Sequence, residues 1–467
     1  KKIVHARMAT SSEEEALHAL CPLDGRYRER VQALRAYFSE AALMKYRVRV
    51  EVEYLVSLAE TLETPFDADA WRSITANFGA ADAARIKAIE KVTNHDVKAV
   101  EYFLKEKYDA LFSSQEQQRG NMKEMIHFGL TSQDVNHIAQ PLALAECARD
   151  VIIPKYASLV EKLRGKAWTW RDVAMLSRTH GQAATPTRLG KEFAVFADRL
   201  GKCVDAMTKA THSAKFGGAI GALNAHVVAY PAVDWSTFAD RFVESVSGGL
   251  LTRQQYTTQI EQYDDLAAFC HAVTRANVVL LDFCRDVWQY VSLGYFRQVV
   301  KAGEVGSSAM PHKVNPIDFE NAEGNVGVAN ALFAHLADKL PVSRLQRDLS
   351  DSTVLRTVGM PLGHTLLAVA SALRGLGKLA LDEDALRRDL DDNWVVVSEA
   401  IQTILRREHY PEPYEALKLL TRGNPHIDQA RLHAFIDNDL NGISDALKAE
   451  LKHISPHTYL GVFDAEP

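Results

Sequence analysis

The sequence predicts an all-α fold, because apolar residues recur at helical spacing over long stretches and alternating strand patterns are scarce. The clearest stretches are Leu266–Trp288 and Phe193–Met207, where apolar residues three and four positions apart fall on one face of a helix. About the only strand-like segment is 226–230, and Pro231 ends it. Helices longer than the average of about 11–12 residues need partners along their length, so a central bundle of long helices is expected.

Three consecutive segments are expected along the chain. Residues 1–120 form an N-terminal, charged helical domain that ends in a polar linker at 113–120. Residues 121–376 hold the long-helix patterns of the central bundle domain, and residues 377–467 form a C-terminal domain of shorter helices. A chain of 467 residues is too long for one simple core, which agrees with this division.

Single residues place the helix boundaries of the last segment. Gly375 and Gly377 are expected to interrupt the chain before it. Asp382 is a candidate N-cap of the next helix, and a further helix is expected to begin after Pro413 and to end at Gly423. Proline at the start of a helix and glycine just past its end is the usual arrangement.

Composition argues against several classes of protein. The formal net charge is −6 and the basic residues are scattered, so nothing indicates binding to nucleic acid. No apolar run approaches the roughly 18 residues that a membrane span needs. The first twenty residues lack the hydrophobic centre of a secretory signal. We therefore expect a cytoplasmic protein without a membrane partner.

The five cysteines are odd in number and lack the CxxC spacing of metal or redox sites. Cys203, Cys270 and Cys284 fall at apolar positions of the helical patterns, so buried thiols in a reducing compartment are expected. The sequence contains no phosphate loop, zinc-binding helix or nucleophile elbow, and we expect neither a metal nor a cofactor.

The run Gly306–Pro316, which reads GSSAMPHKVNP, carries more chemistry than any other segment. It places two hydroxyls after a glycine, followed by imidazole, ammonium and amide groups between two prolines. Glycine leaves the backbone mobile, and the prolines keep the run out of a regular helix. A Gly/Ser-rich surface linker is the ordinary alternative. Linkers rarely combine Met, His, Lys and Asn, so we expect a catalytic loop between rigid helices.

This run resembles the GSSxMPxKxNP signature of the fumarase/aspartase superfamily, whose members eliminate fumarate from succinyl-type substrates. His312 before Lys313 resembles the adenylosuccinate lyase family within it. The resemblance implies a three-domain, all-α fold that assembles into a homotetramer, with three subunits contributing to each site. It also implies elimination of fumarate from adenylosuccinate, which leaves AMP, and from SAICAR, which leaves AICAR, without a metal or redox cofactor.

The resemblance assigns the two catalytic roles to Ser307 and His180. Ser307 would be the base that removes a proton beside a carboxylate, and His180 the acid that protonates the leaving nitrogen. From the residues alone, His180 in the segment 177–182 could equally be structural, because hydroxyl, glycine and amide neighbours suit either role. A helix is expected to begin near Pro186, shortly after this segment.

The resemblance also assigns roles to the residues that follow Ser307. Closure of the loop would have to lower the pKa of the Ser307 hydroxyl through backbone N–H groups and nearby cations, with Lys313 the obvious candidate. Lys313 and Asn315 would hold the substrate carboxylate whose charge grows in the transition state.

Thr131 and Ser132 begin a segment that resembles the family's TSxD sequence, whose hydroxyls bind carboxylate or phosphate oxygens. The alternative is an ordinary helix N-cap, since Thr or Ser followed by Asp and a helical run is typical of helix initiation. Both can hold, because the amides and the dipole of a helix start attract anions. Gln133 stands where relatives commonly carry Glu.

Asn94, His95 and Asp96 resemble the family's NHD segment and would orient the substrate. Three consecutive side chains diverge on a helix, so a helix start or a turn is needed for them to converge. A simple helix cap is the alternative from the residues alone.

The remaining substrate contacts implied by the resemblance lie far apart in the chain. Arg347, Ser352 and Arg356 would bind the nucleotide phosphate, because a guanidinium fork suits its oxygens, and on a helix Ser352 and Arg356 share a face. A solvated face paired with Asp348 and Asp351 is the alternative. The other contacts are Gln259, Arg26 and Tyr27.

Two other functions stay open at this point. One is a sister lyase such as argininosuccinate lyase, and the other is a catalytically inactive helical scaffold. A Ser–His hydrolase ranks lower, because neither a nucleophile elbow nor an acidic third partner is evident.

Overall fold

The computed structural model describes residues 12–112, 122–299, 310, 313–421 and 427–464, and within them the all-α prediction is confirmed. The α-helices are α1 (Ser12–Leu17), α2 (Arg35–Phe38), α3 (Glu40–Thr61), α4 (Ala68–Ala76), α5 (Ala80–Thr93), α6 (Asp96–Phe112), α7 (Ser132–Cys147), α8 (Ile153–Thr169), α9 (Leu189–Thr208), α10 (Asn224–Ala229), α11 (Trp235–Ser247), α12 (Asp264–Ser292), α13 (Ile317–Lys339), α14 (Ser350–Leu355), α15 (Gly359–Lys378), α16 (Glu383–Asp391), α17 (Ser398–Arg407), α18 (Pro413–Thr421), α19 (Gln429–Asn438) and α20 (Asp445–His453).

Short helices and strands connect these elements. The 3₁₀ helices are η1 (Arg28–Leu34), η3 (Met122–Met125), η5 (Gly218–Ile220) and η6 (Trp394–Val397), and η4 (Ala148–Ile152) is a π-helical turn. The strands pair as β1 (Ala174–Thr179) with β2 (Gln182–Arg188), β3 (Ser213–Ala214) with β4 (Thr252–Arg253), and β5 (Phe296–Gln298) with β6 (Leu379–Leu381). Of these pairs, β3–β4 is parallel and the other two are antiparallel.

The chain divides into two compact units. Unit 1 comprises residues 1–155, 203–278 and 324–368, and unit 2 comprises residues 156–202, 279–323 and 369–467. The division falls within α8, α9, α12, α13 and α15. The three-segment division expected from the sequence stays a prediction.

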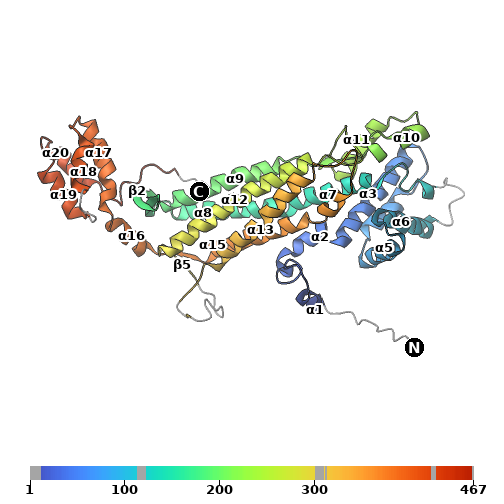
Figure 1. Cartoon of the computed structure of the whole chain (residues 1–467), viewed down its shortest axis with the longest axis horizontal. Coiled ribbons are helices and arrows are strands. Elements are labelled where there is room, and N and C mark those ends of the chain that lie inside the picture. The colour runs from blue at the N-terminus through green and yellow to red at the C-terminus, as the bar shows by residue number, and fades with distance from the viewer. Residues whose placement is uncertain (1–11, 113–121, 300–309, 311–312, 422–426, 465–467) are drawn as a thin grey trace. The chain divides into compact units, whose positions relative to one another are not determined.

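Helix α3 organises the core of unit 1, because it is buried on two faces. Tyr54 and Leu58 belong to an apolar cluster shared with α7 and α11. Val52 and Leu55 belong to a second cluster, which α4, α5 and α6 complete. Figure 1 shows α5 and α6 side by side within this unit, where they pack against each other and against α3. The two apolar stripes of α3 thus hold together the helices whose ends carry Asn94–Asp96 and Thr131–Ser132.

Aromatic rings join the long helices of unit 2. The ring centroid of Phe283 in α12 lies 5.7 Å from that of Phe193 in α9 and 6.1 Å from that of Phe319 in α13. Gly375 lies inside α15 next to this cluster, where a Cβ atom would approach the Phe319 ring to 2.7 Å. The prediction that Gly375 and Gly377 interrupt the chain is therefore wrong, because close packing explains the glycine at 375 within a continuous helix.

The strand predictions are also wrong. Segment 226–230 lies largely in α10 rather than in a strand, and its β-branched Val227 and Val228 are exposed. Segments 174–179 and 182–188 form the β1–β2 hairpin instead of loop and helix. Pro186 lies in β2, and the helix expected near it begins at Leu189. A two-stranded hairpin consists only of edge strands, where proline is tolerated.

Several boundary and burial predictions are confirmed. The Asp382 side chain accepts a hydrogen bond from the Ala385 N–H group and caps α16, and Pro413 is the first residue of α18. The cysteines are free thiols, and those at the predicted apolar positions are buried. The expected linker at 113–120 and the helix end at Gly423 lie outside the described residues.

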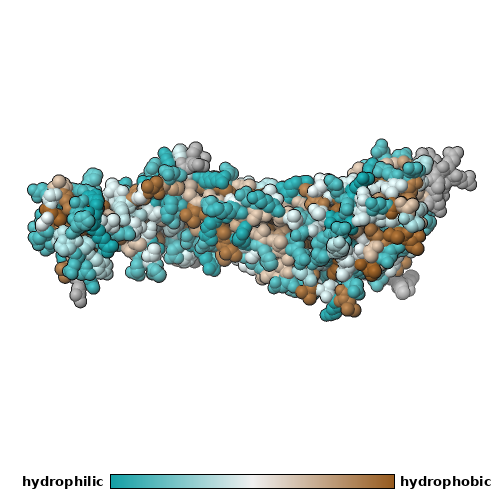
Figure 2. Space-filling model, turned by 90° about the horizontal axis from the view of Figure 1, so that it is seen from above, coloured by the Kyte–Doolittle hydropathy of each residue, from teal (hydrophilic) through white to brown (hydrophobic). Residues whose placement is uncertain are grey.

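The surface mixes polar and apolar residues. Figure 2 shows both kinds interspersed over the visible face, and α9, α12 and α13 expose Val195, Val278 and Val328. Among the described helices, only α12 is long and apolar enough by length and composition to cross a membrane. The sequence interpretation predicted this helix but not that it could pass for a membrane span. Half of its most apolar stretch is buried inside the protein, as in an ordinary core helix. Its length and composition are therefore weak evidence for a membrane span.

Candidate active site

Unit 1 holds two adjoining pockets that bring together most of the predicted substrate-binding residues. We call the larger one the polar pocket; it is lined by Arg47, Glu90, Asn94, His95, Asp96, Ser132, Gln133, Asn136, Gln140, Arg347, Leu349, Ser352, Thr353 and Arg356. The second, which we call the side pocket, shares part of this wall and is lined by His95, Lys98, Glu101, His127, Leu130, Thr131, Ser132, Gln259 and Arg347. Arginines dominate the cations of the polar pocket, so the arrangement suits an anionic ligand.

A tight turn makes the side chains of Asn94, His95 and Asp96 converge. Helix α5 ends at Thr93, Asn94 adopts a left-handed conformation with φ of 53°, and α6 begins at Asp96. Nδ1 of His95 accepts a hydrogen bond of 3.1 Å from the Lys98 N–H group, which leaves its Nε2 atom available to the pocket. The three residues thus lie at a helix start and line one cavity. This is the turn that, as expected from the sequence, they need in order to converge.

Two arginines meet on the carboxylate of Asp96. Arg47 Nη2 lies 2.7 Å and Arg356 Nη2 lies 2.9 Å from Asp96 Oδ2. Burial alone would raise the pKa of Asp96, but Arg47 and then Arg356 lower it below its ordinary value, so the carboxylate is ionised at neutral pH. Arg356 therefore pairs with Asp96 and Glu40 rather than with Asp348 or Asp351. The solvated-face alternative does not describe this arginine.

Arg47 and Asn136 are pocket residues that the sequence analysis missed. The Arg47 side chain is only 3% exposed, and its Nε atom donates to Asn136 Oδ1 over 2.8 Å. Several charged residues of α3 surround Arg47 in the sequence, so nothing local singled it out as the buried one. Nothing in the sequence distinguished Asn136 from other polar residues of α7.

The start of α7 is both an N-cap and part of the pocket wall. Thr131 is the N-cap residue, and its N–H group donates to Asp134 Oδ2 over 2.8 Å. Asp134 Oδ1 accepts a hydrogen bond of 2.7 Å from Lys215 Nζ, and it also accepts hydrogen bonds from the N–H groups of Gly217 and Gly218. Burial alone would raise the pKa of Asp134, but Lys215 and these donors lower it. The ion pair thus fixes the helix start whose hydroxyls line both pockets.

Breaking this buried ion pair should destabilise the fold strongly. Both side chains are 0% exposed, so Lys215→Met would leave the Asp134 carboxylate buried without its counter-charge. We expect the free energy of unfolding to fall by about 3–5 kcal/mol. Denaturant unfolding followed by circular dichroism measures this change.

Lys202→Met is the matched control. It also removes a lysine that pairs with an aspartate, Asp198, but the Lys202 side chain is 73% exposed. Its effect should stay below about 1 kcal/mol. Equal stability of the two variants would contradict a structural role for the Lys215–Asp134 pair.

Arg347 lies at the junction of the two pockets. Its Nη1 atom donates to Gln259 Oε1 over 3.0 Å and its Nη2 atom donates to Ser352 Oγ over 3.1 Å. Gln259 is held in turn by a 3.0 Å bond from its Nε2 atom to the Ala219 carbonyl oxygen. Within the described residues, Nε of Arg347 has no hydrogen-bond partner, and Asp351 Oδ1 lies 4.0 Å from it. The fork of Arg347 is thereby oriented, while its Nε atom is buried on the side that faces Asp351.

His127 is a further cation that the sequence analysis did not identify. Its Nδ1 atom forms an ion pair with Oε1 of the buried Glu51. Burial alone would lower the pKa of His127, but Glu51 raises it above its ordinary value. The backbone of His127 adopts a left-handed conformation with φ of 62°. Its side chain lines the side pocket together with Arg347. In the sequence, Glu51 is one of several acidic residues of α3, so no local signal pointed to this pair.

Comparisons with known families and proteins show which family this chain belongs to. Residues 25–330 match the family described as Lyase, and residues 343–460 match the adenylosuccinate lyase C-terminal family. An adenylosuccinate lyase of Dictyostelium discoideum is 52% identical over 465 residues, covering 97% of this chain and 98% of that relative. The chain belongs to the adenylosuccinate lyase family. A relative of the same name from Escherichia coli (strain K12) is 47% identical and covers 96% of this chain and 98% of its own length.

Solved structures support the same family fold. The structure of a fumarate lyase from Mesorhizobium sp. BNC1 matches with a TM-score of 0.73 at 18% identity, covering 92% of this chain and 95% of that chain. A 3-carboxy-cis,cis-muconate lactonizing enzyme from Pseudomonas putida matches with a TM-score of 0.70 at 20% identity, covering 92% and 94% respectively. Identities this low show the fold alone.

The histidine that the family resemblance makes the general acid lies in unit 2. His180 is exposed at the tip of the β1–β2 hairpin, between the paired residues Thr179 and Gln182. His180 and Gly181 have φ values of 53° and 74°, as a two-residue hairpin turn requires. The hairpin therefore presents the imidazole at the end of a rigid element rather than at the start of a helix.

The other predicted residues lie outside the two pockets of unit 1. Lys313 and Asn315 belong to unit 2 and lie just before α13. Arg26 is exposed and Tyr27 precedes η1, and neither lines the polar pocket or the side pocket. Ser307 lies outside the described residues, as does His312. No group of three or more His, Cys, Asp or Glu side chains within the described part of the chain is arranged to hold a metal ion.

Proposed function

We propose that this chain is a carbon–nitrogen lyase that eliminates fumarate from adenylosuccinate, leaving AMP, and from SAICAR, leaving AICAR. A base removes the proton from the carbon beside one succinyl carboxylate, and the C–N bond on the neighbouring carbon breaks. The electron pair of the C–H bond becomes the new C=C bond of fumarate. The leaving nitrogen takes the electrons of the C–N bond and a proton from an acid. The reaction is neither a hydrolysis nor a redox step.

The family resemblance supports one assignment of these roles. Ser307 acts as the base and His180 as the acid, while Lys313 and Asn315 hold the carboxylate whose negative charge grows. Tyr27, Asn94, His95 and Asp96 orient the rest of the substrate. Arg347, Ser352 and Arg356 bind the phosphate, and Arg26, Thr131, Ser132 and Gln259 complete the substrate contacts.

The observation that carries this proposal is the polar pocket itself. Three guanidinium groups, from Arg47, Arg347 and Arg356, line one cavity together with hydroxyl and amide side chains. A substrate with a phosphate and two carboxylates needs this excess of fixed donors. The relatives named above supply the identity of that substrate, since each is called an adenylosuccinate lyase.

Turnover of purified protein tests the proposal directly. Adenylosuccinate should be converted to AMP and fumarate in equal amounts, measured by absorbance and chromatography. Argininosuccinate in place of adenylosuccinate should give no fumarate. Turnover of argininosuccinate alone would favour a sister lyase, and turnover of neither compound would favour an inactive scaffold.

Assembly and location belong to the same proposal. We infer a cytoplasmic homotetramer in which three subunits contribute to each site, with the three-domain division 1–120, 121–376 and 377–467. The family resemblance is what supports this assembly. Sedimentation equilibrium should give the mass of four chains, and a fully active monomer would refute the shared site.

The charge of His127 should set an alkaline limit to substrate binding. Because Glu51 raises the pKa of His127, the imidazolium is present below that pKa and is lost as the pH rises through it. Glu51→Gln removes the counter-charge and leaves burial to lower the pKa. We expect the alkaline fall of kcat/KM to move to lower pH, as measured between about pH 6 and 9.

Glu53→Gln is the control for this prediction, since Glu53 lies on the same helix and pairs with the exposed Arg72. Its pH profile should match that of the unaltered enzyme. An unchanged alkaline limb in Glu51→Gln would remove His127 from the substrate site.

A further inference from the structure

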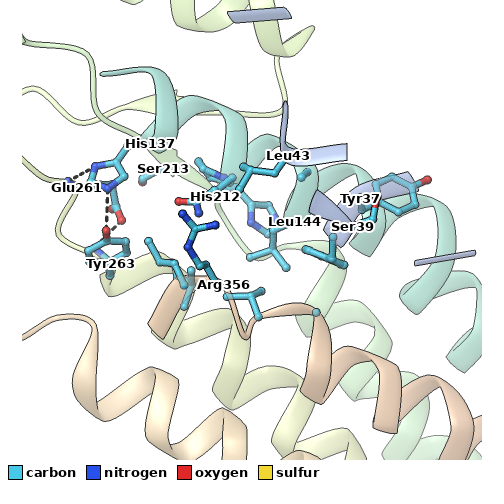
Figure 3. Close-up of a pocket in the computed structure, with 18 of the residues that line it drawn as sticks. Tyr37, Ser39, Leu43, His137, Leu144, His212, Ser213, Glu261, Tyr263 and Arg356 are labelled. Atoms are coloured by element: carbon cyan, nitrogen blue, oxygen red, sulfur yellow. Dashed lines mark hydrogen bonds between the residues drawn. The ribbon is translucent and has the colours of Figure 1, made fainter. Parts of the chain in front are cut away.

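A buried polar cluster lies directly behind the polar pocket. Figure 3 shows His137, Glu261 and Tyr263 together at one end of a neighbouring pocket, with dashed lines for the hydrogen bonds that His137 makes to the other two residues. His137 is 1% exposed and Tyr263 is 3% exposed. Neither side chain lines the polar pocket, and the proposed reaction does not use them. Buried polar groups that reach no ligand need another explanation.

The hydrogen bonds fix the tautomer of His137. Its Nδ1 atom accepts a 2.9 Å bond from the Glu261 N–H group, so Nδ1 carries no proton. Burial lowers the pKa of His137, which keeps the imidazole neutral, and the single ring proton is therefore on Nε2. The Nε2 atom lies 2.7 Å from the Tyr263 hydroxyl oxygen and donates to it.

This tautomer also fixes the direction of the Tyr263 hydroxyl. Because the oxygen accepts from His137, the Tyr263 proton is free to point to Asp351 Oδ2, 2.9 Å away. The same Oδ2 atom accepts a 3.2 Å bond from Gln133 Nε2. Asp351 is 3% exposed, and an ionised carboxylate at this depth needs several donors.

Asp351 connects this chain to the substrate pocket. Its Oδ1 atom accepts from the Ser352 hydroxyl over 3.4 Å and lies 4.0 Å from Nε of Arg347. Ser352 Oγ accepts in turn from Arg347 and, over 3.5 Å, from Gln133. The hydrogen bonds from His137 through Tyr263 and from Arg347 through Ser352 thus converge on the Asp351 carboxylate, so removal of a donor on one side disturbs the groups on the other.

We propose that Tyr263 and His137 are positioning residues for the substrate, because they hold the Asp351 carboxylate that orients Ser352 and Arg347 in the polar pocket. The inference rests on the proposed function and deepens it. It assigns the two buried residues to recognition of the substrate's anionic group rather than to chemistry at the breaking bond. Loss of either residue should therefore raise KM and leave kcat nearly unchanged.

Tyr263→Phe tests the proposal with the loss of one oxygen atom. The variant leaves the His137 Nε2–H group without a partner and removes the Tyr263 donor from the Asp351 carboxylate, which keeps Gln133 and Ser352. We expect KM for adenylosuccinate to rise about tenfold or more, because hydrogen bonds to charged groups contribute more than neutral ones, with kcat within about threefold of the unaltered enzyme. Calorimetric binding of AMP should weaken by the same factor.

Tyr46→Phe is the matched control. The Tyr46 hydroxyl likewise donates to a carboxylate, that of Glu146, which also accepts from Arg49 over 2.9 Å, and none of these residues lines either substrate pocket. Tyr46 is 8% exposed. This variant should lose a comparable amount of thermal stability while its KM stays within about twofold.

A pH profile separates positioning from general destabilisation. Burial alone would raise the pKa of Asp351, but hydrogen bonds from His137, Tyr263 and the Ser352 N–H group lower it. Among the cations around this cluster, Arg347 Nε lies 4.0 Å from Asp351 Oδ1, Lys215 lowers the pKa of His137, and Arg356 lines the same neighbouring pocket as His137 and Tyr263. Without the Tyr263 hydroxyl the pKa of Asp351 should rise, because one of the hydrogen bonds that lower it is lost. The acid limb of the kcat/KM profile should therefore move to higher pH. Tyr46→Phe should not move that limb.

The outcomes distinguish the two proposals. Absence of adenylosuccinate turnover in the unaltered enzyme would count against the proposed function. Normal turnover with unchanged KM, AMP affinity and acid limb in Tyr263→Phe would overturn the positioning role. If Tyr263→Phe does not fold, His137→Gln and the isosteric Asp351→Asn carry the same test, and an unchanged KM in both would overturn the inference.

Discussion

His180→Gln is expected to lower kcat for adenylosuccinate by about 10²–10⁴-fold while substrate still binds, because general acid catalysis typically contributes this much. A glutamine amide has no acidic proton to give to the leaving nitrogen. Ser307→Ala should be equally severe, since it removes the proposed base. The double variant should lose little more than either single variant if the two groups act in one step.

Both substitutions have close controls within the same chain. His409 is an exposed histidine of unit 2 with φ of 55°, compared with 53° for His180, so His409→Gln tests the same change at a site without a catalytic role. Ser308→Ala removes the neighbouring hydroxyl of the same loop. We expect both controls to keep kcat within about threefold. A near-normal kcat in Ser307→Ala would show that another group is the base.

The sequence predicted the helical fold because its long helices carry an unbroken apolar stripe. Leu266–Trp288 falls within α12 and Phe193–Met207 within α9. Prediction failed where local pattern and packing disagree. Val227 and Val228 have strand propensity, but the segment has no sheet to join and forms α10. Gly375 has the composition of a break, but the ring of Phe319 requires it inside α15.

Many residues of the candidate site could be predicted from the sequence, but the contacts between them could not. Asn94, Thr131, Gln259 and Arg347 could be chosen from local motifs and resemblance. Their convergence depends on contacts between segments far apart in the chain, such as those of Gln133 with Asp351 and of Asp96 with Arg356, which no local pattern encodes. Arg47 illustrates the limit, because α3 also carries Arg49 and several other charged residues, and the sequence shows neither that Arg47 is the buried arginine nor that Asp96 is its partner. Likewise, nothing in the sequence indicated that the Tyr263 hydroxyl would donate to Asp351.

Arg347→Met is expected to lower kcat/KM by about a hundredfold or more, mainly through KM, because a charged fork that meets an anionic substrate is removed. Arg347→Lys should recover little of this loss. One ammonium group cannot replace the two N–H groups that reach Gln259 and Ser352 and still present a third to the ligand. Initial rates over a range of adenylosuccinate concentrations give both constants.

Arg344→Met provides the matched control three residues earlier. The Arg344 side chain is 83% exposed and lies 3.4 Å from Asp348, so its removal should change kcat/KM by less than about twofold. Asp351 keeps Tyr263 and Gln133 as donors in Arg347→Met, and the fold should therefore survive the substitution with its circular dichroism unchanged. A folded Arg347→Met enzyme with an unaltered KM would mean that the substrate's charge is bound elsewhere. Together with a normal Arg344→Met enzyme, such a result would remove the polar pocket from the reaction.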